Sequence, residues 1–281
     1  MNKLNKILIS IDISEDNRKF LEYSKFIVER LQGDGILFHV IPNVFGSYVP
    51  YDVRLEEVEQ AIQSLQRNVE SVLSDLSNEY GFEYGYDMGS PYLKIVEFIK
   101  HNDIDLVIVN GGNPGEEIGT QAHKVARKAD VPVLVYKTHP PGIEKILYTT
   151  DLSEKAEESY PLALEFKNKF GASLTVFHVI EPITGYFDDT MLSGVPVFNL
   201  EELKKSALAS MREKFKECND HIVEIGASTA DTIIEFAKEN GFDLIVMSTH
   251  GRGGLEKILL GSVTEKVVRF SHTPVLVSRI K

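Results

Sequence analysis

The sequence predicts an α/β protein of two similar halves, each built on a parallel β-sheet with helices on both faces. The first observation is an internal repeat, because short motifs of the first half recur about 140 residues later. The second is the alternation of short apolar runs with stretches that keep the apolar spacing of an amphipathic helix. The third is that the apolar runs are continuous, which is typical of parallel strands buried on both faces.

The repeat extends over nearly the whole chain. The matching segments, with their offsets, are 6–15 and 145–154 (139), 38–41 and 177–180 (139), 95–98 and 233–236 (138), and 131–135 and 273–277 (142). A nearly constant offset predicts two copies of one domain, over residues 1–138 and 143–281. The segment His139-Pro140-Pro141-Gly142 between them is typical of a short, stiff linker.

Each half is predicted to alternate strand and helix in the same order. In the first half the expected strands are 6–11, 35–41, 82–88, 104–109 and 131–136, and the expected helices are 14–31, 55–76, one starting at Ser90-Pro91, and 120–129. Ser14 and Ser90 are expected N-caps, and Pro91 is expected at the first helical position. This layout predicts two tandem flavodoxin/Rossmann-like domains, each a five-stranded parallel sheet. Ligands of such folds bind beyond the carboxyl ends of the strands.

Composition narrows the class of protein. The chain has 281 residues, 43% of them apolar, and a net charge of −12, which disfavours nucleic acids and anionic membranes as partners. It has a single cysteine, Cys218, which we expect to be a packing residue in a reducing compartment. There is no apolar run of 18 residues, and the first apolar run is too short for a signal peptide. These features predict a cytoplasmic protein with no membrane partner.

One stretch of the second half carries the features of a phosphate site. Residues 244–247 are predicted to form a buried strand, and Gly251, Gly253 and Gly254 follow them closely. Ser262 and Glu265 have the spacing of a capping box, which predicts a helix that starts at Gly261-Ser262. The N–H groups and the dipole of a helix start favour phosphate. The stretch matches neither the P-loop nor the Rossmann GxGxxG motif.

The stretch instead resembles the nucleotide loop of the universal stress protein family, G-x2-G-x9-G-(S/T). Gly251, nine further residues and Gly261-Ser262 match this pattern, whereas its first glycine falls on Ser248. Together with the repeat, the whole chain resembles a tandem universal stress protein, which implies an adenine nucleotide as ligand. A glycine-rich loop without any ligand is the alternative interpretation.

The resemblance implies a set of binding residues. It places Asp151 at the adenine end of the nucleotide and the backbone of Val179 against adenine. Asp151 has an alternative role, which is to cap the turn before Ser153. Around the phosphates the implied contact positions are Met247, Ser248, Gly251, Gly261, Ser262 and Val263. Arg252, with His250 and Lys257, would add positive charge, although Arg252 is equally compatible with a solvated surface position.

Catalytic residues and protein-bound metal are not predicted. His39 and His178 each stand alone in an apolar strand, so we interpret them as hydrogen-bonded core histidines rather than ligands. Mg²⁺ held only through the phosphates of ATP stays open. The first half keeps Asp12 and Val40, but its loop is four residues shorter and carries Glu116 and Glu117, which predicts a degenerate nucleotide site. That half is expected to complete an intramolecular pseudo-dimer, and a homodimer of chains also stays open.

These observations favour a regulatory protein of the stress response that binds ATP, ADP or AMP in its second domain. The first alternative is a slow ATPase or phosphoryl-transfer enzyme, but no Walker lysine, arginine cluster or positioned base is found. The second is a scaffold whose nucleotide sites are vestigial. Nucleotide affinity separates the scaffold from the other two.

Overall fold

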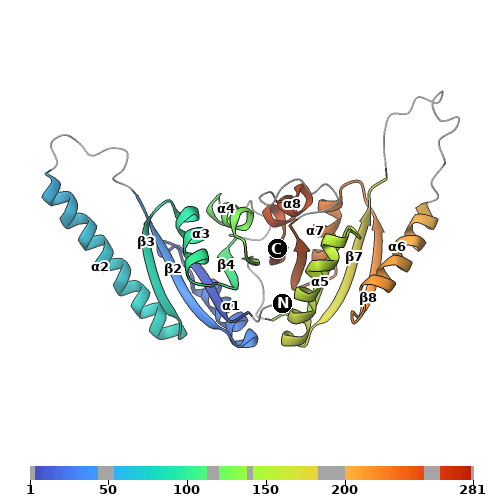
Figure 1. Ribbon diagram of the computed structural model, residues 1–281, viewed down its shortest axis with the longest axis horizontal. Helices are drawn as coiled ribbons and strands as arrows, with labels where there is room; N and C mark the ends of the chain where they lie inside the picture. Colours follow the sequence, from blue (N-terminus) through green and yellow to red (C-terminus); the bar gives the residue numbers. More distant parts are fainter. Residues whose placement is uncertain are drawn as a thin grey trace, which may run out of the picture. The chain divides into compact units, whose positions relative to one another are not determined.

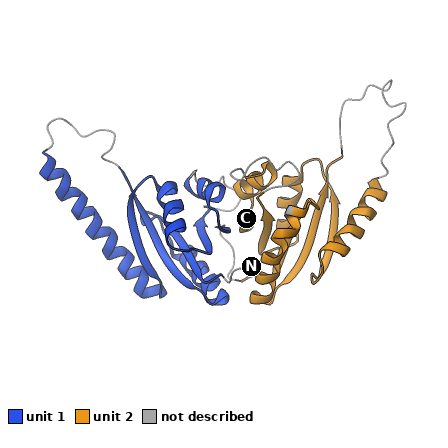
Figure 2. Ribbon diagram, in the orientation of Figure 1, with its two compact units in different colours: residues 1–141 blue, residues 142–281 orange. Residues whose placement is uncertain are grey.

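The chain divides into two compact units, Met1–Pro141 and Gly142–Lys281 (Figure 2). The computed structural model describes residues 4–43, 54–112, 120–137, 142–182, 200–249 and 260–279. Both units alternate strand and helix along the chain (Figure 1). Within these ranges no helix combines the length and the apolar character needed to cross a bilayer.

The first unit is a parallel sheet of five described strands in the order β3-β2-β1-β4-β5. The strands are β1 (Lys6–Ile11), β2 (Asp34–Pro42), β3 (Glu83–Gly89), β4 (Leu106–Asn110) and β5 (Val133–Tyr136). The helices are α1 (Arg18–Leu31), α2 (Leu55–Tyr80), α3 (Pro91–His101) and α4 (Thr120–Lys128). Helix α1 contacts α2, and α3 contacts α4, as expected for helix pairs on opposite faces of the sheet.

The second unit repeats this architecture with the strand order β8-β7-β6-β9-β10, again all parallel. The strands are β6 (Lys145–Thr149), β7 (Ser173–Ile180), β8 (Asp220–Ile225), β9 (Leu244–Ser248) and β10 (Val275–Ser278). The helices are α5 (Glu154–Phe170), α6 (Leu200–Lys214), α7 (Thr229–Glu239) and α8 (Ser262–Phe270). The predicted fold class is therefore confirmed.

The strand order is the one found in Rossmann folds rather than in flavodoxin, where the first strand lies between the second and the third. Strand order reverses between β6 and β9 in the second unit. The central strands there are fully buried, as the paired residues Leu147 and Ile245 illustrate with 0% exposure. The carboxyl ends of β6 and β9 consequently flank the crevice where ligands of such sheets bind.

Three predicted helix starts differ in detail. Helix α1 begins at Arg18 after the N-cap Asn17, so the prediction that Ser14 caps it is wrong. Ser14 instead donates its N–H and its hydroxyl to Asp12 Oδ1, at 3.0 and 2.7 Å. Ser90 does occupy the N-cap of α3, but its side chain makes no capping hydrogen bond. Helix α8 begins at Ser262 as predicted, but its N-cap is Gly261, so the predicted capping box is not formed.

Candidate functional site

A cavity of about 1110 Å³ lies in the second unit, at the carboxyl ends of β6, β7 and β9. Helices α6, α7 and α8 contribute its other walls. The cavity is lined by seven of the nine residues predicted for the nucleotide site: Asp151, Val179, Met247, Ser248, Gly261, Ser262 and Val263. The other two, Gly251 and Arg252, lie outside the described residues, as do His250 and Lys257.

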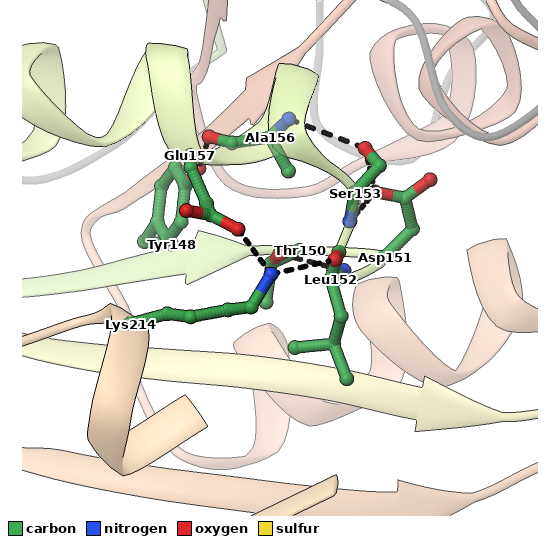
Figure 3. A network of polar contacts seen from close by, with 8 residues as sticks. All are labelled: Tyr148, Thr150, Asp151, Leu152, Ser153, Ala156, Glu157 and Lys214. Carbon is green, nitrogen blue, oxygen red and sulfur yellow. Dashed lines mark hydrogen bonds and ion pairs between the residues drawn. The ribbon is translucent and has the colours of Figure 1, made fainter. Parts of the chain in front are cut away.

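Asp151 follows β6 and forms a tight turn with the residues after it (Figure 3). Its Oδ1 accepts hydrogen bonds from the N–H and the hydroxyl of Ser153, at 3.0 and 2.6 Å. Ser153 in turn caps α5, because its Oγ accepts the N–H of Ala156 at 3.3 Å. The turn-capping role of Asp151 is therefore real, and it coexists with a place on the cavity wall.

The same turn is held from α6. Lys214 forms an ion pair with Glu157 of α5 and donates to the carbonyl of Leu152 at 3.4 Å (Figure 3). Behind the turn, the hydroxyl of Tyr148 donates to the carbonyl of Ala156, and burial raises the pKa of this tyrosine, so it stays neutral. These contacts fix the position of Asp151 at the edge of the cavity.

The end of β7 forms the adjacent wall. His178 lines the cavity and its Nδ1 donates to the carbonyl of Thr150 at 2.8 Å. In the first unit, His39 is buried and makes the matching bond to the carbonyl of Ile11 at 3.1 Å. Both histidines are thus hydrogen-bonded as predicted, and each ties the second strand of its unit to the first. Only His39 is buried, however, so the predicted core position is wrong for His178, which is half-buried on the cavity wall. Val179 is 8% exposed and lines the cavity.

The start of α8 faces the cavity from the side of β9. Gly261 N–H donates to the carbonyl of Thr249 at 2.7 Å, and Thr264 Oγ1 donates to the carbonyl of Ser248 at 2.8 Å. A Cβ at Gly261 would lie 3.2 Å from Thr249 O, which explains why a glycine suits this approach. The two bonds hold the first turn of the helix against the end of the strand.

The corrected N-cap changes what this turn can bind. In a capping box the serine side chain would accept the N–H of the third helical residue. With Gly261 as N-cap, the N–H groups of Ser262, Val263 and Thr264 donate to no other group of the described chain. These donors and the helix dipole make a favourable position for an anion.

Charge is distributed unevenly around the cavity. Its described lining includes the carboxylates of Asp151 and Glu181, both beside the ends of β6 and β7, and includes neither lysine nor arginine. Hydrogen-bond acceptors therefore gather on this wall, whereas backbone donors gather at α8. Such a cavity suits a ligand with hydroxyl or amino donors at one end and an anion at the other. Among the described residues there is no cluster of three side chains that could hold a metal ion.

Several lining residues were not predicted. They come mainly from α6, α7 and the end of β7, and include Glu181, Leu203, Ser206, Ala207, Ser210, Thr229 and Ile233. Ser206 and Ser210 are four residues apart and so share one face of α6. The cluster of small residues on this face was the available signal, but helical spacing alone does not show what a face borders.

In the first unit, Asp12 accepts the same two bonds from Ser14 that Asp151 accepts from Ser153. Val40 is buried, as Val179 is. After β4, Gly112 N–H donates to Asn110 Oδ1 at 3.0 Å and Lys137 Nζ donates to Gly111 O at 2.9 Å. Residues 113–119, with Glu116 and Glu117, lie outside the described residues, so the degenerate character of this loop stays a prediction.

Comparison with known proteins agrees with this architecture. The model of the universal stress protein family matches residues 3–137 and again residues 142–279. The chain belongs to the universal stress protein family. It holds two copies of the family's domain in tandem, as the internal repeat predicted.

Individual relatives match one copy or both. Universal stress protein MJ0577 of Methanocaldococcus jannaschii is 32% identical over 155 residues, which cover 49% of this chain and 96% of the relative. Universal stress protein YxiE of Bacillus subtilis is 30% identical over 145 residues, covering 48% of this chain and 98% of the relative. A universal stress protein structure from Archaeoglobus fulgidus covers 99% of both chains with a TM-score of 0.69, and at 19% identity it bears on the fold alone.

Proposed function

We propose that the second unit of this universal stress protein binds an adenine nucleotide, ATP, ADP or AMP, and that occupancy regulates the protein in a stress response. The observation that carries the proposal is the start of α8. Three backbone N–H groups and the positive end of the helix dipole meet at Ser262, on the wall of a large cavity. The acceptor-rich wall at Asp151 and Glu181 suits the donors of a ribose and an adenine amine.

Binding is favoured over catalysis by the chemistry of the wall. Phosphoryl transfer develops negative charge that enzymes stabilise with arginine, lysine or metal ions. The described lining offers backbone donors and carboxylates instead of cationic side chains. If Mg²⁺ takes part, it would be held through the nucleotide phosphates. We also propose that the two units form a pseudo-dimer, and light scattering of the intact protein would distinguish one chain from a homodimer.

The test is a calorimetric titration of the intact protein with ATP, ADP and AMP, with and without Mg²⁺. Its decisive variant is Ser262→Glu, which places a carboxylate at the proposed phosphate position. A glutamate in the first turn also suits the helix dipole, so stability should be unchanged or slightly higher. We expect nucleotide binding to be lost while the unfolding temperature is kept.

Gly261→Val is a less clean test, because its Cβ would crowd Thr249 O at 3.2 Å and disturb the helix start itself. The matched substitution in the first unit, Gly119→Val, lies outside the described residues and should change binding little. An unaltered protein that binds none of the three nucleotides at millimolar concentration would refute the proposal and favour a vestigial site.

A further inference from the structure

A chain of polar contacts runs through the first turn of α7 and links the end of β7 to α8. At one end, Glu181 Oε1 accepts the N–H of Thr229, and both residues line the cavity. At the other end, Lys266 of α8 donates to Asp231 Oδ2 at 2.6 Å and to Ser228 Oγ at 3.5 Å. Ser228 is the N-cap of α7 and accepts the N–H of Asp231 at 3.5 Å.

This chain ends one helical turn from the proposed phosphate position. Lys266 follows Ser262 by four residues, so both lie on the same face of α8. Asp231 and Lys266 do not line the cavity, whereas Ser262 does. The ion pair therefore acts on the helix that carries the N–H donors, and not on the ligand position itself.

The first unit lacks this chain at the matching positions. By the repeat offsets, Glu181 and Thr229 correspond to Pro42 and Pro91, and a proline at the helix start has no N–H to donate. Asp231 corresponds to Leu93. Lys124, which corresponds to Lys266, lies instead over the ring of Tyr92, with Nζ 5.0 Å from the ring centre. The contacts are thus a feature of the unit whose loop matches the nucleotide motif.

Stability alone does not explain the Lys266–Asp231 pair. The two side chains are 44% and 49% exposed, and ion pairs this exposed contribute little to folding free energy. The hydrogen bond from Lys266 nevertheless lowers the pKa of Asp231, so the pair is fully charged at neutral pH. Its geometric effect is to bind α8 to the first turn of α7, which Glu181 in turn binds to β7.

We infer that Lys266 and Asp231 are positioning residues, whose contact holds the first turn of α8 so that its N–H groups face the nucleotide phosphate. The inference rests on the proposed function and deepens it. It differs from a direct role, in which Lys266 would leave Asp231 and contribute its charge to the phosphate. The two roles predict opposite effects when Asp231 is neutralised.

The experiment titrates the intact protein and its variants Lys266→Met, Asp231→Asn and the double variant with adenosine, AMP and ATP. If the pair positions the helix, each single variant weakens AMP and ATP binding by about two- to fivefold, the range expected for an exposed ion pair. The double variant should bind no more weakly than either single one, because one contact is lost in all three. Adenosine binding should be unchanged, since adenosine carries no phosphate.

Two further variants serve as controls. Lys266→Arg keeps the ion pair and should restore AMP affinity. Lys124→Met removes the matching lysine of the first unit and should leave AMP affinity at the unaltered value. Thermal unfolding of every variant shows whether a loss of affinity follows a loss of fold.

Two results would overturn the inference. The first is that Asp231→Asn binds ATP more tightly while Lys266→Met binds it more weakly, with both effects larger for ATP than for AMP. This result would assign Lys266 a direct charge role. The second is that AMP and ATP affinities are unchanged in both single variants, which would show that the ion pair has no role in nucleotide binding. An unaltered protein that binds neither AMP nor ATP would be a failure of the proposed function, and is recognised before any variant is made.

Discussion

At the scale of single residues, Asp12 and Asp151 show that a carboxylate kept in both units need not indicate a ligand. Each accepts the N–H and the hydroxyl of a serine two residues later, and so closes the turn after its strand. The turn alone accounts for an aspartate in both positions. Asp151, in addition to closing its turn, lines the cavity of the second unit.

Asp151→Asn tests this separation, because an asparagine oxygen can still accept both bonds from Ser153 and keep the turn. A hydrogen bond to a charged acceptor is stronger than a neutral one by about 1 kcal/mol. We therefore expect about fivefold weaker nucleotide binding, with little change in unfolding temperature, in a calorimetric titration. Asp12→Asn is the matched control and should not change affinity. Equal losses in both variants would mean that the effect is transmitted through the fold.

Cys218 offers a second test at this scale. It is half-buried, and its Sγ lies 3.5 Å from the carbonyl of Phe215 and 3.2 Å from Nε2 of His221. Burial raises the pKa of the thiol, so a smaller fraction of it is in the reactive thiolate form at any pH near neutrality. Iodoacetamide at about pH 8, close to the pKa of an exposed thiol, should modify the native protein severalfold more slowly than the urea-unfolded protein.

Because the chain has one cysteine, each reaction product reports on Cys218 alone. Equal rates of modification in the native and unfolded proteins would contradict the packing role. The rate of modification should rise at a higher pH in the native protein than in the unfolded protein, since the pKa of the thiol is higher in the folded state.

At the scale of elements, the strands and helices were predictable from apolar periodicity, but the residues that cap the helices were not. The segments Asp12-Ile13-Ser14-Glu15 and Asp151-Leu152-Ser153-Glu154 are nearly the same, yet only the second serine caps a helix. The difference comes from the residue three positions after the serine, which is Asn17 in the first unit and Ala156 in the second. Asn17 Nδ2 donates to the carbonyls of Asp12 and Glu15, which holds a longer turn, whereas Ala156 has only its N–H to offer.

Ser153→Ala should therefore destabilise the protein more than Ser14→Ala. The first substitution removes a helix cap, which typically costs about 1 kcal/mol. The second removes only a hydroxyl bond to an exposed carboxylate, for which about 0.5 kcal/mol is reasonable. Urea unfolding followed by circular dichroism measures both. An equal or larger effect of Ser14→Ala would show that the turn before α1 matters more than its missing cap.

The candidate site was predictable where it depends on the loop motif. The motif placed Gly261, Ser262 and Val263 at a helix start, and the structure has them there. It misplaced the N-cap by one residue, because bonds to the carbonyls of Thr249 and Ser248 decide where the helix begins, and these need the tertiary fold. The cavity-lining residues of α6 and the hydrogen bond between Glu181 and Thr229 were also not predictable. Both depend on which helices and strands pack together, and apolar periodicity does not show this.

At the scale of the whole molecule, one fold occurs twice with different chemistry at matching places. Both units keep the strand order, the aspartate turn and the histidine bond between the first two strands. The second unit adds the nucleotide motif and the polar chain through α7. The shared features maintain the fold of both units, whereas the nucleotide motif and the polar chain divide the second unit from the first. This division predicts one competent site per chain.

The count of bound nucleotide tests that prediction directly. We expect mass spectrometry of freshly purified, denatured protein to find about one adenine nucleotide per chain, because the nucleotide motif belongs to the second unit, where the N–H donors of α8 lie on the cavity wall. Ser262→Glu should release it, and Asp12→Asn should retain it. At a free concentration of about 100 times Kd, the ligand should also stabilise the protein by about 2.7 kcal/mol. Two nucleotides per chain would show that Glu116 and Glu117 do not exclude phosphate and that both units bind.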